Sequence, residues 1–290
     1  MSKVLVMTDT VSGLSKEMAG EFGIRIVPAA NILFDGRSYP DGVGITADEA
    51  YKLLQKNPDK FSTATLNPSY LLDIFRQVSK EYSEIVFMTI PIVLSAANKI
   101  ASMAADLLKQ EQPQINLRVI DAKSVAAPQG LLAIAAAKAA NSGMSLEQVI
   151  DYISKIRPKI GGLMLLDTLK YVYRTGRYSK TTAMIATLLQ IKPINRVNLD
   201  GSMEVVDKVR KRQDGYNRLL ELIQKEAGTD ALHFMVSHAS SPEIAQEFIE
   251  LLKSKFNCLS MMITEYSPIM GYASGPRCLF VGFHPELEKS

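Results

Sequence analysis

The chain has 290 residues, of which 47% are hydrophobic and 22% are charged, and its formal net charge is +3. At about 150 residues per domain, this length predicts two domains. The near-neutral charge argues against a strongly cationic nucleic-acid-binding protein and against an acidic tail protein, so no nucleic-acid partner is expected. The cysteines, Cys258 and Cys278, form no Cys-x-x-Cys pair, which excludes a disulfide scaffold and argues against a thiolate zinc site.

The first ten residues, MSKVLVMTDT, resemble a short strand followed by turn residues and lack the long apolar core of a secretory signal. The longest apolar stretches, such as residues 131–137, are far shorter than the ~20 residues needed to span a bilayer. We therefore expect a soluble protein located in the cytoplasm.

Strand and helix patterns alternate through the first half of the chain. Strands are predicted at residues 3–7, 24–27, 84–88 and 116–120, helices at 14–21, 46–55, 68–80, 95–110, 124–141 and 146–156, and a hairpin around the turn Asp35-Gly36. Strands separated by helices of this length form βαβ units. The pattern therefore predicts an α/β domain whose sheet is mostly parallel and flanked by helices.

The second half mixes a hairpin with helices. After Gly161-Gly162 come the apolar segment LMLLDTL and two helical stretches to about Leu189; a hairpin is predicted at 192–209, helices at 212–227 and 242–254, and strands at 232–237, 258–265 and 278–283. This order favours an α+β domain with a mixed or antiparallel sheet. We place the boundary near Arg157-Pro158, which gives domains 1–158 and 159–290.

No standard catalytic motif occurs in the sequence: it has no GxSxG elbow, no GxGxxG after a strand, no Walker loop and no HExxH. The three histidines, His233, His238 and His284, are isolated from one another in the sequence. His233 and His238 are five residues apart on a predicted strand and therefore point to opposite faces. We expect these histidines to be packed side chains, and we predict no metal site and no catalytic residue.

Three loops carry the candidate site: residues 65–69, 91–95 and 271–276. The first two lead into predicted helices, and in open α/β sheets ligands collect where loops leave the carboxyl ends of strands. Free N–H groups at a helix N-terminus attract anions, and Thr65 and Ser95 each add a hydroxyl group. Two interpretations stay open, namely that these residues cap helices or that they bind an anion. The third loop is by itself a Gly/Pro turn.

At these loops the chain resembles the DegV family of bacterial fatty-acid-binding proteins. The similarity covers nearly the whole length, and its segments occur in the same order as in the family. The matching segments are TDTVSGL (8–14), IVP (26–28), SYPDG (38–42), TLNPS (65–69), VLSAA (93–97), VIDAKS (119–124), DTLKYVYRTGRYS (167–179), IKPI (191–194) and KVR (208–210). The common order of these segments carries the resemblance.

The resemblance implies two domains with one long-chain, palmitate-like fatty acid in a buried tunnel between them. It implies that the residues matching Thr65 and Ser95 bind the carboxylate. The lipid-binding set that it predicts is Thr65, Leu66, Ser95, Ala96, Arg177, Ala273 and Ser274. Some family members are the acyl-carrying subunit of a fatty acid kinase. The expected function is therefore a non-catalytic carrier without a cofactor, which presents its fatty acid to a partner such as that kinase.

The sequence also departs from the family pattern near the implied carboxylate. Ala273 stands where the family usually has histidine, Arg277 replaces a glycine, Leu66 replaces a serine, and Pro91-Ile92 replaces a pair of serines. A buried carboxylate that lacks hydrogen bonds is costly and has a raised pKa. We therefore hypothesise that this chain binds the head group more weakly, binds it protonated, or binds a less polar lipid.

Basic residues form two groups, Lys208, Arg210, Lys211 and Arg212 near the predicted hairpin, and Arg174, Arg177 and Lys180 near another loop. Such groups are often solvated surface charge. With the resemblance, we predict that Arg177, Arg210 and Lys208 form a surface for the kinase partner or, transiently, for an anionic membrane.

Two other functions stay open. One is an enzyme of the same fold that binds a small polar ligand in the same crevice through Asp9, Thr10, Thr65 and Ser95. This enzyme lacks a candidate general base. The other is a regulatory or interaction module that has lost its ligand. Lipid that stays bound through purification would favour the carrier over both.

Overall fold

The structure is a computed structural model that describes residues 3–176 and 191–286. The elements of the first half are β1 (Val4–Asp9), η1 (Thr10–Ser12), α1 (Lys16–Phe22), β2 (Ile24–Val27), β3 (Asn31–Phe34), β4 (Arg37–Pro40), α2 (Ala47–Lys56), η2 (Pro58–Lys60), β5 (Phe61–Ala64), α3 (Pro68–Val78), β6 (Glu84–Thr89), α4 (Ala97–Glu111), β7 (Asn116–Asp121), α5 (Ala126–Asn141), α6 (Leu146–Ile156) and η3 (Arg157–Lys159). Those of the second half are β8 (Gly161–Leu165), α7 (Lys170–Arg174), β9 (Lys192–Val197), β10 (Met203–Val209), α9 (Arg212–Ala227), β11 (Leu232–His238), α10 (Pro242–Lys255), β12 (Cys258–Glu265), α11 (Pro268–Ser274) and β13 (Leu279–Pro285).

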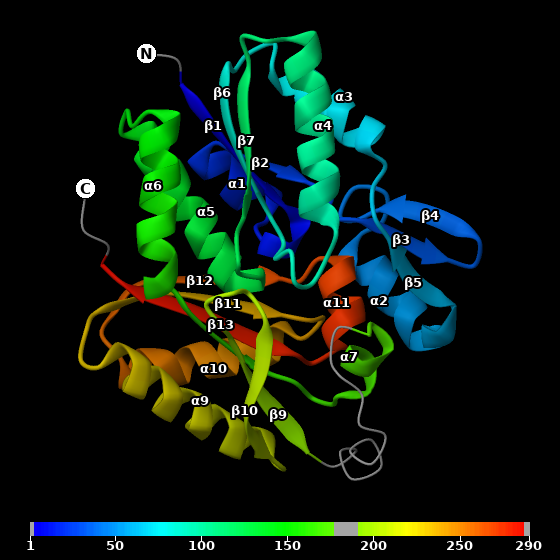
Figure 1. The fold of residues 1–290 in the computed structure, drawn as a ribbon. Helices are drawn as coiled ribbons and strands as arrows, with labels where there is room; N and C mark the ends of the chain where they lie inside the picture. The colour runs from blue at the N-terminus through cyan, green and yellow to red at the C-terminus, as the bar shows by residue number, and fades with distance from the viewer. Residues whose placement is uncertain (1–2, 177–190, 287–290) are drawn as a thin grey trace.

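The first sheet has the strand order β2-β1-β6-β7, and all its strands are parallel. Its strands are apolar on both faces because helices cover both, as is usual for parallel sheets. In β1, Val4 and Val6 face the core under α5 and α6, whereas Leu5 and Met7 face the core under α3 and α4. Figure 1 shows these helix pairs on opposite sides of the sheet. The predicted parallel sheet with flanking helices is confirmed.

The second sheet has six strands in the order β10-β9-β8-β13-β11-β12. Strands β11 and β12 are parallel, and the other neighbours are antiparallel. Helices α9 and α10 cover its outer face over a core that includes Leu163, Tyr216 and Phe248. The predicted mixed sheet is confirmed, as is the hairpin of β9 and β10.

Helix α5 lies between the two sheets (Figure 1) and packs against β1 on one side and β13 and β11 on the other. Nearly all its residues are buried, as expected for a helix that is apolar on every side. Its contact with β13 requires a glycine, because a Cβ added to Gly282 would lie 2.7 Å from the backbone nitrogen of Pro128. The start of α5 is thereby fixed beside the second sheet.

A small antiparallel sheet, β4-β3-β5, lies beside these layers. The predicted hairpin is present, and Asp35 and Gly36 both have positive φ values, of 49° and 77°, which suits the twist of a tight hairpin. Strand β5 (Phe61–Ala64), which pairs with β3, was not predicted from the sequence. Of the two helical stretches expected before Leu189, α7 is described, whereas residues 177–190 lie outside the described part.

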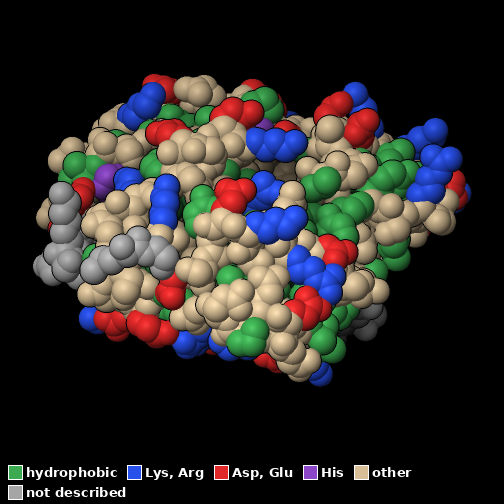
Figure 2. All heavy atoms as spheres, turned by 90° about the horizontal axis from the view of Figure 1, so that it is seen from above, with side chains coloured by type: hydrophobic (Ala, Val, Ile, Leu, Met, Phe, Trp, Pro, Cys, Tyr) green, Lys and Arg blue, Asp and Glu red, His purple; other side chains and the backbone are tan. Residues whose placement is uncertain are grey.

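Among the described residues, none of the helices combines the length and the apolar character that crossing a membrane requires. On the face seen in Figure 2, basic and acidic side chains lie interspersed, with hydrophobic side chains between them. This mixture agrees with the small net charge of the chain.

Candidate functional site

A cavity of about 110 Å³ lies between the two larger sheets, and we call it the central cavity. Its walls come from η1, β5, the loop after β6, the start of α5, β8, α7, β10, α11 and β13. The residues that line it are Val11, Thr63, Ile90, Leu94, Ser95, Val125, Met164, Val172, Thr175, Met203, Ile269, Met270, Tyr272, Ala273, Ser274 and Phe280. Segments from both halves of the chain therefore enclose one mostly apolar space.

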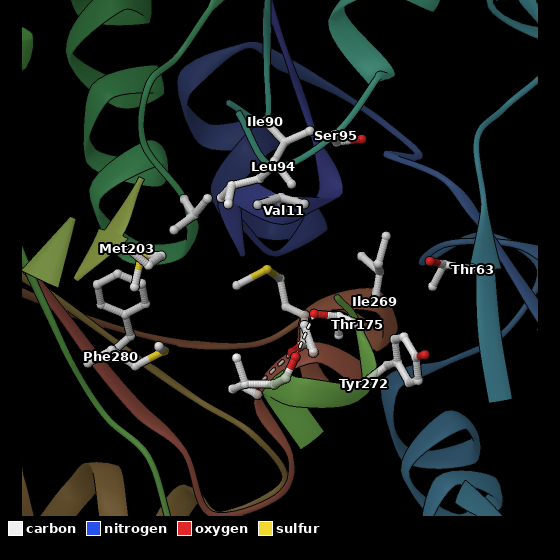
Figure 3. A pocket seen from close by; sticks show the side chains of 16 residues that line it. Val11, Thr63, Ile90, Leu94, Ser95, Thr175, Met203, Ile269, Tyr272 and Phe280 are labelled. Atoms are coloured by element: carbon white, nitrogen blue, oxygen red, sulfur yellow. Dashed lines mark hydrogen bonds between the residues drawn. The ribbon is translucent and has the colours of Figure 1, made fainter. Parts of the chain in front are cut away.

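The polar side chains of the central cavity are unevenly distributed. In Figure 3, Ser95, Thr63 and Tyr272, each with a hydroxyl group, lie on one side, and Met203 and Phe280 lie on the other. The Ser95 hydroxyl oxygen accepts a hydrogen bond of 3.2 Å from the amide of Ala97 at the start of α4, which leaves its proton for another acceptor. A cavity with a hydroxyl-bearing side and an apolar side is suited to an amphiphile.

Three methionines, Met164, Met203 and Met270, contribute to the lining. Methionine side chains are unbranched and adopt many shapes, so they repack at small cost. The lining can therefore widen without a change of fold.

Asp9 lies behind the cavity wall and is 1% exposed. Its carboxylate accepts hydrogen bonds from the amides of Val11 (3.1 Å) and Ile90 (2.6 Å) and from the side chain of Gln129 (2.9 Å). Burial raises the pKa of Asp9 to about 7, against the opposing effect of the bonds from Ile90, Gln129 and Val11. Because Val11 and Ile90 line the cavity, Asp9 fixes two parts of its wall.

Asp41 holds a third part of the wall. It is fully buried and accepts hydrogen bonds from the Thr10 hydroxyl and, at 3.0 Å, from the amide of Ile269. The Thr10 oxygen in turn accepts a bond of 3.0 Å from the amide of Ala29. Burial raises the pKa of Asp41 to about 6, although the bond from Thr10 opposes this shift. Asp9 and Thr10, the ligands expected for a small polar molecule, thus already bind protein groups.

The predicted residues of the first two loops occupy different surroundings. Ser95 lines the central cavity. Thr65 is exposed one residue after β5, and Thr63, two residues earlier, lines the cavity in that strand. Leu66 is buried beside Asp9 in the neighbouring core. Ala96 is exposed at the N-cap of α4.

The third loop, predicted as a simple turn, begins within the last residues of α11, which ends at Ser274. Ala273 and Ser274 both line the cavity, and the Ser274 hydroxyl donates a hydrogen bond of 2.9 Å to the carbonyl of Met270. Arg277, at the position of a family glycine, has a positive φ of 63° and lies outside the cavity lining. Arg177 lies outside the described residues, as does Lys180.

The basic residues of the second half differ in their surroundings. Lys208, Arg210 and Lys211 are exposed, whereas Arg212 and Lys192 each contact the carboxylate of Asp167 at 2.5 Å. Burial would raise the pKa of Asp167, but the hydrogen bond from Lys192 and the nearby positive charges hold it below its ordinary value.

Arg174 is also engaged, since it pairs with Asp59 at 2.9 Å. The two predicted basic groups are therefore partly ion-paired, and Lys208, Arg210 and Lys211 carry the exposed charge on the β10 side.

The histidines are less isolated than their sequence positions suggested. His233 and His284 are directly opposite each other on β11 and β13, and their rings stack with centroids 4.9 Å apart. His233 also hydrogen-bonds to Ser260 (2.8 Å) and Glu286 (2.9 Å). Burial lowers the pKa of His284 to about 4. Within residues 3–176 and 191–286, no three His, Cys, Asp or Glu side chains are placed to hold a metal ion.

Several residues of the site had no individual signal in the sequence. Thr63 was missed together with β5, and Tyr272 lies in the loop interpreted as a turn. The apolar lining, for example Met164 and Phe280, has the same residue types and spacing as an ordinary core. The signal that could have identified the polar support was Asp41, noted only as a matching position in SYPDG.

Comparison with known protein families matches residues 3–286 to the DegV family, which is described as uncharacterised. A DegV domain-containing protein of Caldanaerobacter subterraneus is 29% identical over 286 residues, which are 98% of this chain and 99% of that protein. A DegV domain-containing protein of Clostridium acetobutylicum is 28% identical over 95% of this chain and 96% of its own length.

Solved structures share the fold over the whole chain. A DegV family protein of Thermus thermophilus, described by its fatty acid binding, has a TM-score of 0.87 at 21% identity and covers 99% of this chain and 100% of its own. DegV of Bacillus subtilis, described as a fatty acid binding protein, has a TM-score of 0.85 at 21% identity with the same coverage. A stearic-acid-binding protein of Eubacterium ventriosum has a TM-score of 0.88 at 25% identity and covers 98% of both chains.

Proposed function

Because the chain belongs to the DegV family, we propose that it binds a long-chain fatty acid in the central cavity and acts as a carrier rather than as an enzyme. The observation that carries this proposal is the lining itself, with hydroxyl groups on one side and methionine and phenylalanine on the other. The solved relatives described as fatty-acid-binding support it, including the stearic-acid-binding protein.

Burial of the chain supplies ample free energy. A sixteen-carbon fatty acid has about 14 methylene groups, worth roughly 11 kcal/mol at ~0.8 kcal/mol each. Lost translational freedom and the ordering of a flexible chain offset several kcal/mol of this gain. A remainder of about 8 kcal/mol corresponds to a dissociation constant of about 1 μM. A covalent bond is therefore unnecessary for retention.

For the head group, we propose Ser95 and Thr65 as hydrogen-bond donors to the carboxylate. Ser95 lines the cavity and keeps a hydroxyl proton to donate. Continuing the alternation of β5 for one residue beyond its end would place Thr65 on the same side as Thr63. The row formed by Thr63 and Thr65 would then extend from the cavity to the exposed surface.

The surroundings of the head group favour an acid that is weakly held or protonated. Ala273 provides apolar surface in the cavity where the family pattern has histidine. The buried carboxyl of Asp9, which accepts a hydrogen bond from the Ile90 amide of the cavity wall, repels a second carboxylate nearby when it is ionised. We propose that a fraction of the bound acid is protonated, so that the affinity for the acid increases as the pH falls from 8 to 6.

We further propose that the exposed basic residues contact the partner that receives the fatty acid, a kinase subunit or an anionic membrane surface. Lys208 and Arg210 are exposed, and Arg177 remains a prediction from the resemblance. Replacing Arg177 with alanine should abolish phosphorylation of the bound lipid by a fatty acid kinase. Phosphorylation at the wild-type rate would contradict the assignment.

The proposal is tested by calorimetric titration of delipidated protein with palmitate, compared with hexanoate, which has the same head group. Since the methylene groups carry the affinity, palmitate should bind at least about 100-fold more tightly. Equal affinities would indicate a site for small carboxylates and would contradict the carrier function.

A further inference from the structure

Asn195 lies on β9 in the interior of the second sheet, paired with Met164 of β8, which lines the central cavity. Asn195 is fully buried (0% exposed). Neither its side-chain nitrogen Nδ2 nor its side-chain oxygen Oδ1 has a hydrogen-bond partner. Both atoms of a buried carboxamide are normally hydrogen-bonded, because a buried unpaired donor or acceptor is costly. Asn195 therefore stands out in a sheet whose inner face is otherwise apolar at this point.

The strand register places Asn195 on the face that forms the cavity. Directly paired residues of neighbouring strands share a face of the sheet. Asn195 pairs with Met164 of β8 on one side and Val205 of β10 on the other, and Met164 pairs with Phe280 of β13. Met164 and Phe280 line the central cavity.

The neighbours of Asn195 along β9 confirm this orientation. Ile194 points to the opposite face, into the core under α9. Val197, two residues further, packs with Met164 and Phe280 on the cavity side. Because side chains alternate along a strand, Asn195 points to the same face of the sheet as Val197 and to the face opposite Ile194.

Asn195 is not itself a lining residue, and its register neighbours lie on the apolar side of the cavity, away from the head-group side. Its row contains Phe280, and Met203 lies two residues from its partner Val205 on β10. Figure 3 shows Phe280 and Met203 opposite Ser95 and Thr63. A fatty acid whose carboxylate contacts Ser95 would thus direct the distal part of its chain toward the Asn195 carboxamide.

From this geometry we infer that Asn195 makes the site selective for a long-chain fatty acid with a hydroxyl group in the distal part of its chain. The inference rests on the proposed function of the cavity. A hydroxyl group both donates and accepts a hydrogen bond, and the carboxamide offers a donor and an acceptor. A plain methylene chain leaves both amide atoms unpaired, so the site discriminates against it, as buried polar groups do against analogues that lack the matching group.

The test compares matched acids on the delipidated protein: palmitate with 16-hydroxypalmitate, and stearate with 12-hydroxystearate. At least one hydroxylated acid should bind about 10-fold more tightly than its parent. In Asn195→Leu this preference should reverse in favour of the parent, and the melting temperature should rise because an unpaired carboxamide is removed. Ile194→Val, an apolar exchange on the opposite face of the same strand, is the control and should keep the wild-type preference.

The wild-type measurement needs no variant and decides the inference by itself. If both hydroxylated acids bind no more tightly than their parents, a protein group or water satisfies Asn195 and the inference is wrong. It is equally wrong if Asn195→Leu keeps the wild-type preference. If the plain acids also fail to bind to the wild-type protein, the carrier function fails with it, which separates the two failures.

Discussion

The two sides of the cavity wall differ in chemistry although the same residues form both. The side chains of Val11, Ile90 and Ile269 face the cavity, while their backbone amides point to the buried carboxylates of Asp9 and Asp41. Apolar contacts are non-directional, so by themselves they do not hold an enclosed space open. Hydrogen bonds are directional, and these fix the backbone of the wall. An apolar site is here positioned by a polar network behind it.

The largest expected effect is the pH dependence of stability. The pKa of Asp9 is raised to about 7 and that of Asp41 to about 6, from 3.8. The folded state therefore binds more protons than the unfolded state between about pH 4 and 7, and the free energy of unfolding should fall as the pH rises through this range. Asp9 accounts for a fall in the free energy of unfolding on the order of 4 kcal/mol.

Urea unfolding at several pH values measures this effect, with Asp9→Asn as the reference. His284 acts in the opposite sense between pH 6.5 and about 4, because its pKa is lowered. The difference between wild type and Asp9→Asn removes that contribution. A difference that does not change between pH 5 and 8 would show that Asp9 titrates normally.

The next effect comes from removing one carboxylate of the network. Asp41→Ala leaves the Thr10 hydroxyl and the Ile269 amide without their acceptor, which should lower the free energy of unfolding by about 3 kcal/mol. Asp73→Ala is the matched control, since the side chain of Asp73 is 71% exposed and its ion pair should contribute less than about 1 kcal/mol. Equal losses in the two variants would contradict a supporting role for Asp41.

On the cavity side of the wall, Ser95→Ala should weaken palmitate binding about 10-fold to 30-fold, since a hydrogen bond to a charged group is lost. Calorimetric titration measures the dissociation constant. Ser69→Ala is the control, because the Ser69 hydroxyl is exposed and bonds to Asn67. The head-group assignment would be wrong if both variants bound palmitate as the wild type does.

The smallest effect is expected from restoring the family residue at Ala273, which lines the cavity. Ala273→His adds a hydrogen-bond donor near the head group and should tighten palmitate binding about 5-fold. The gain should be larger below pH 6.5, where the imidazole is protonated. No change in affinity or in the bound ligand would show that the head group does not lie beside Ala273.

Most of the fold could be predicted from the sequence, because long periodic segments such as 146–156 and 212–227 dominate it. The strand β5 was missed since its four residues, FSTA, alternate too briefly to give a signal. Helix α11 was interpreted as a turn because Gly271 within it and Gly275-Pro276 directly after it resemble loop residues.

The site could be predicted in part. The order of the segments shared with the family predicted Ser95, Ala273 and Ser274 as site residues, and these three residues line the cavity. The role of Asp41 depends on an amide 228 positions away in the sequence, and the position of Asn195 depends on strand register. Pairings of this kind form only in the folded chain, so no local pattern in the sequence carries them.

The central claim, that the cavity carries a long-chain fatty acid, is tested most directly by mass spectrometry of an organic extract from the purified, denatured protein. The account predicts one long-chain fatty acid per chain, and a hydroxylated acid if Asn195 acts as inferred. An extract without lipid, repeated after incubation with palmitate and oleate, would contradict the carrier function and favour a small polar ligand or a regulatory module.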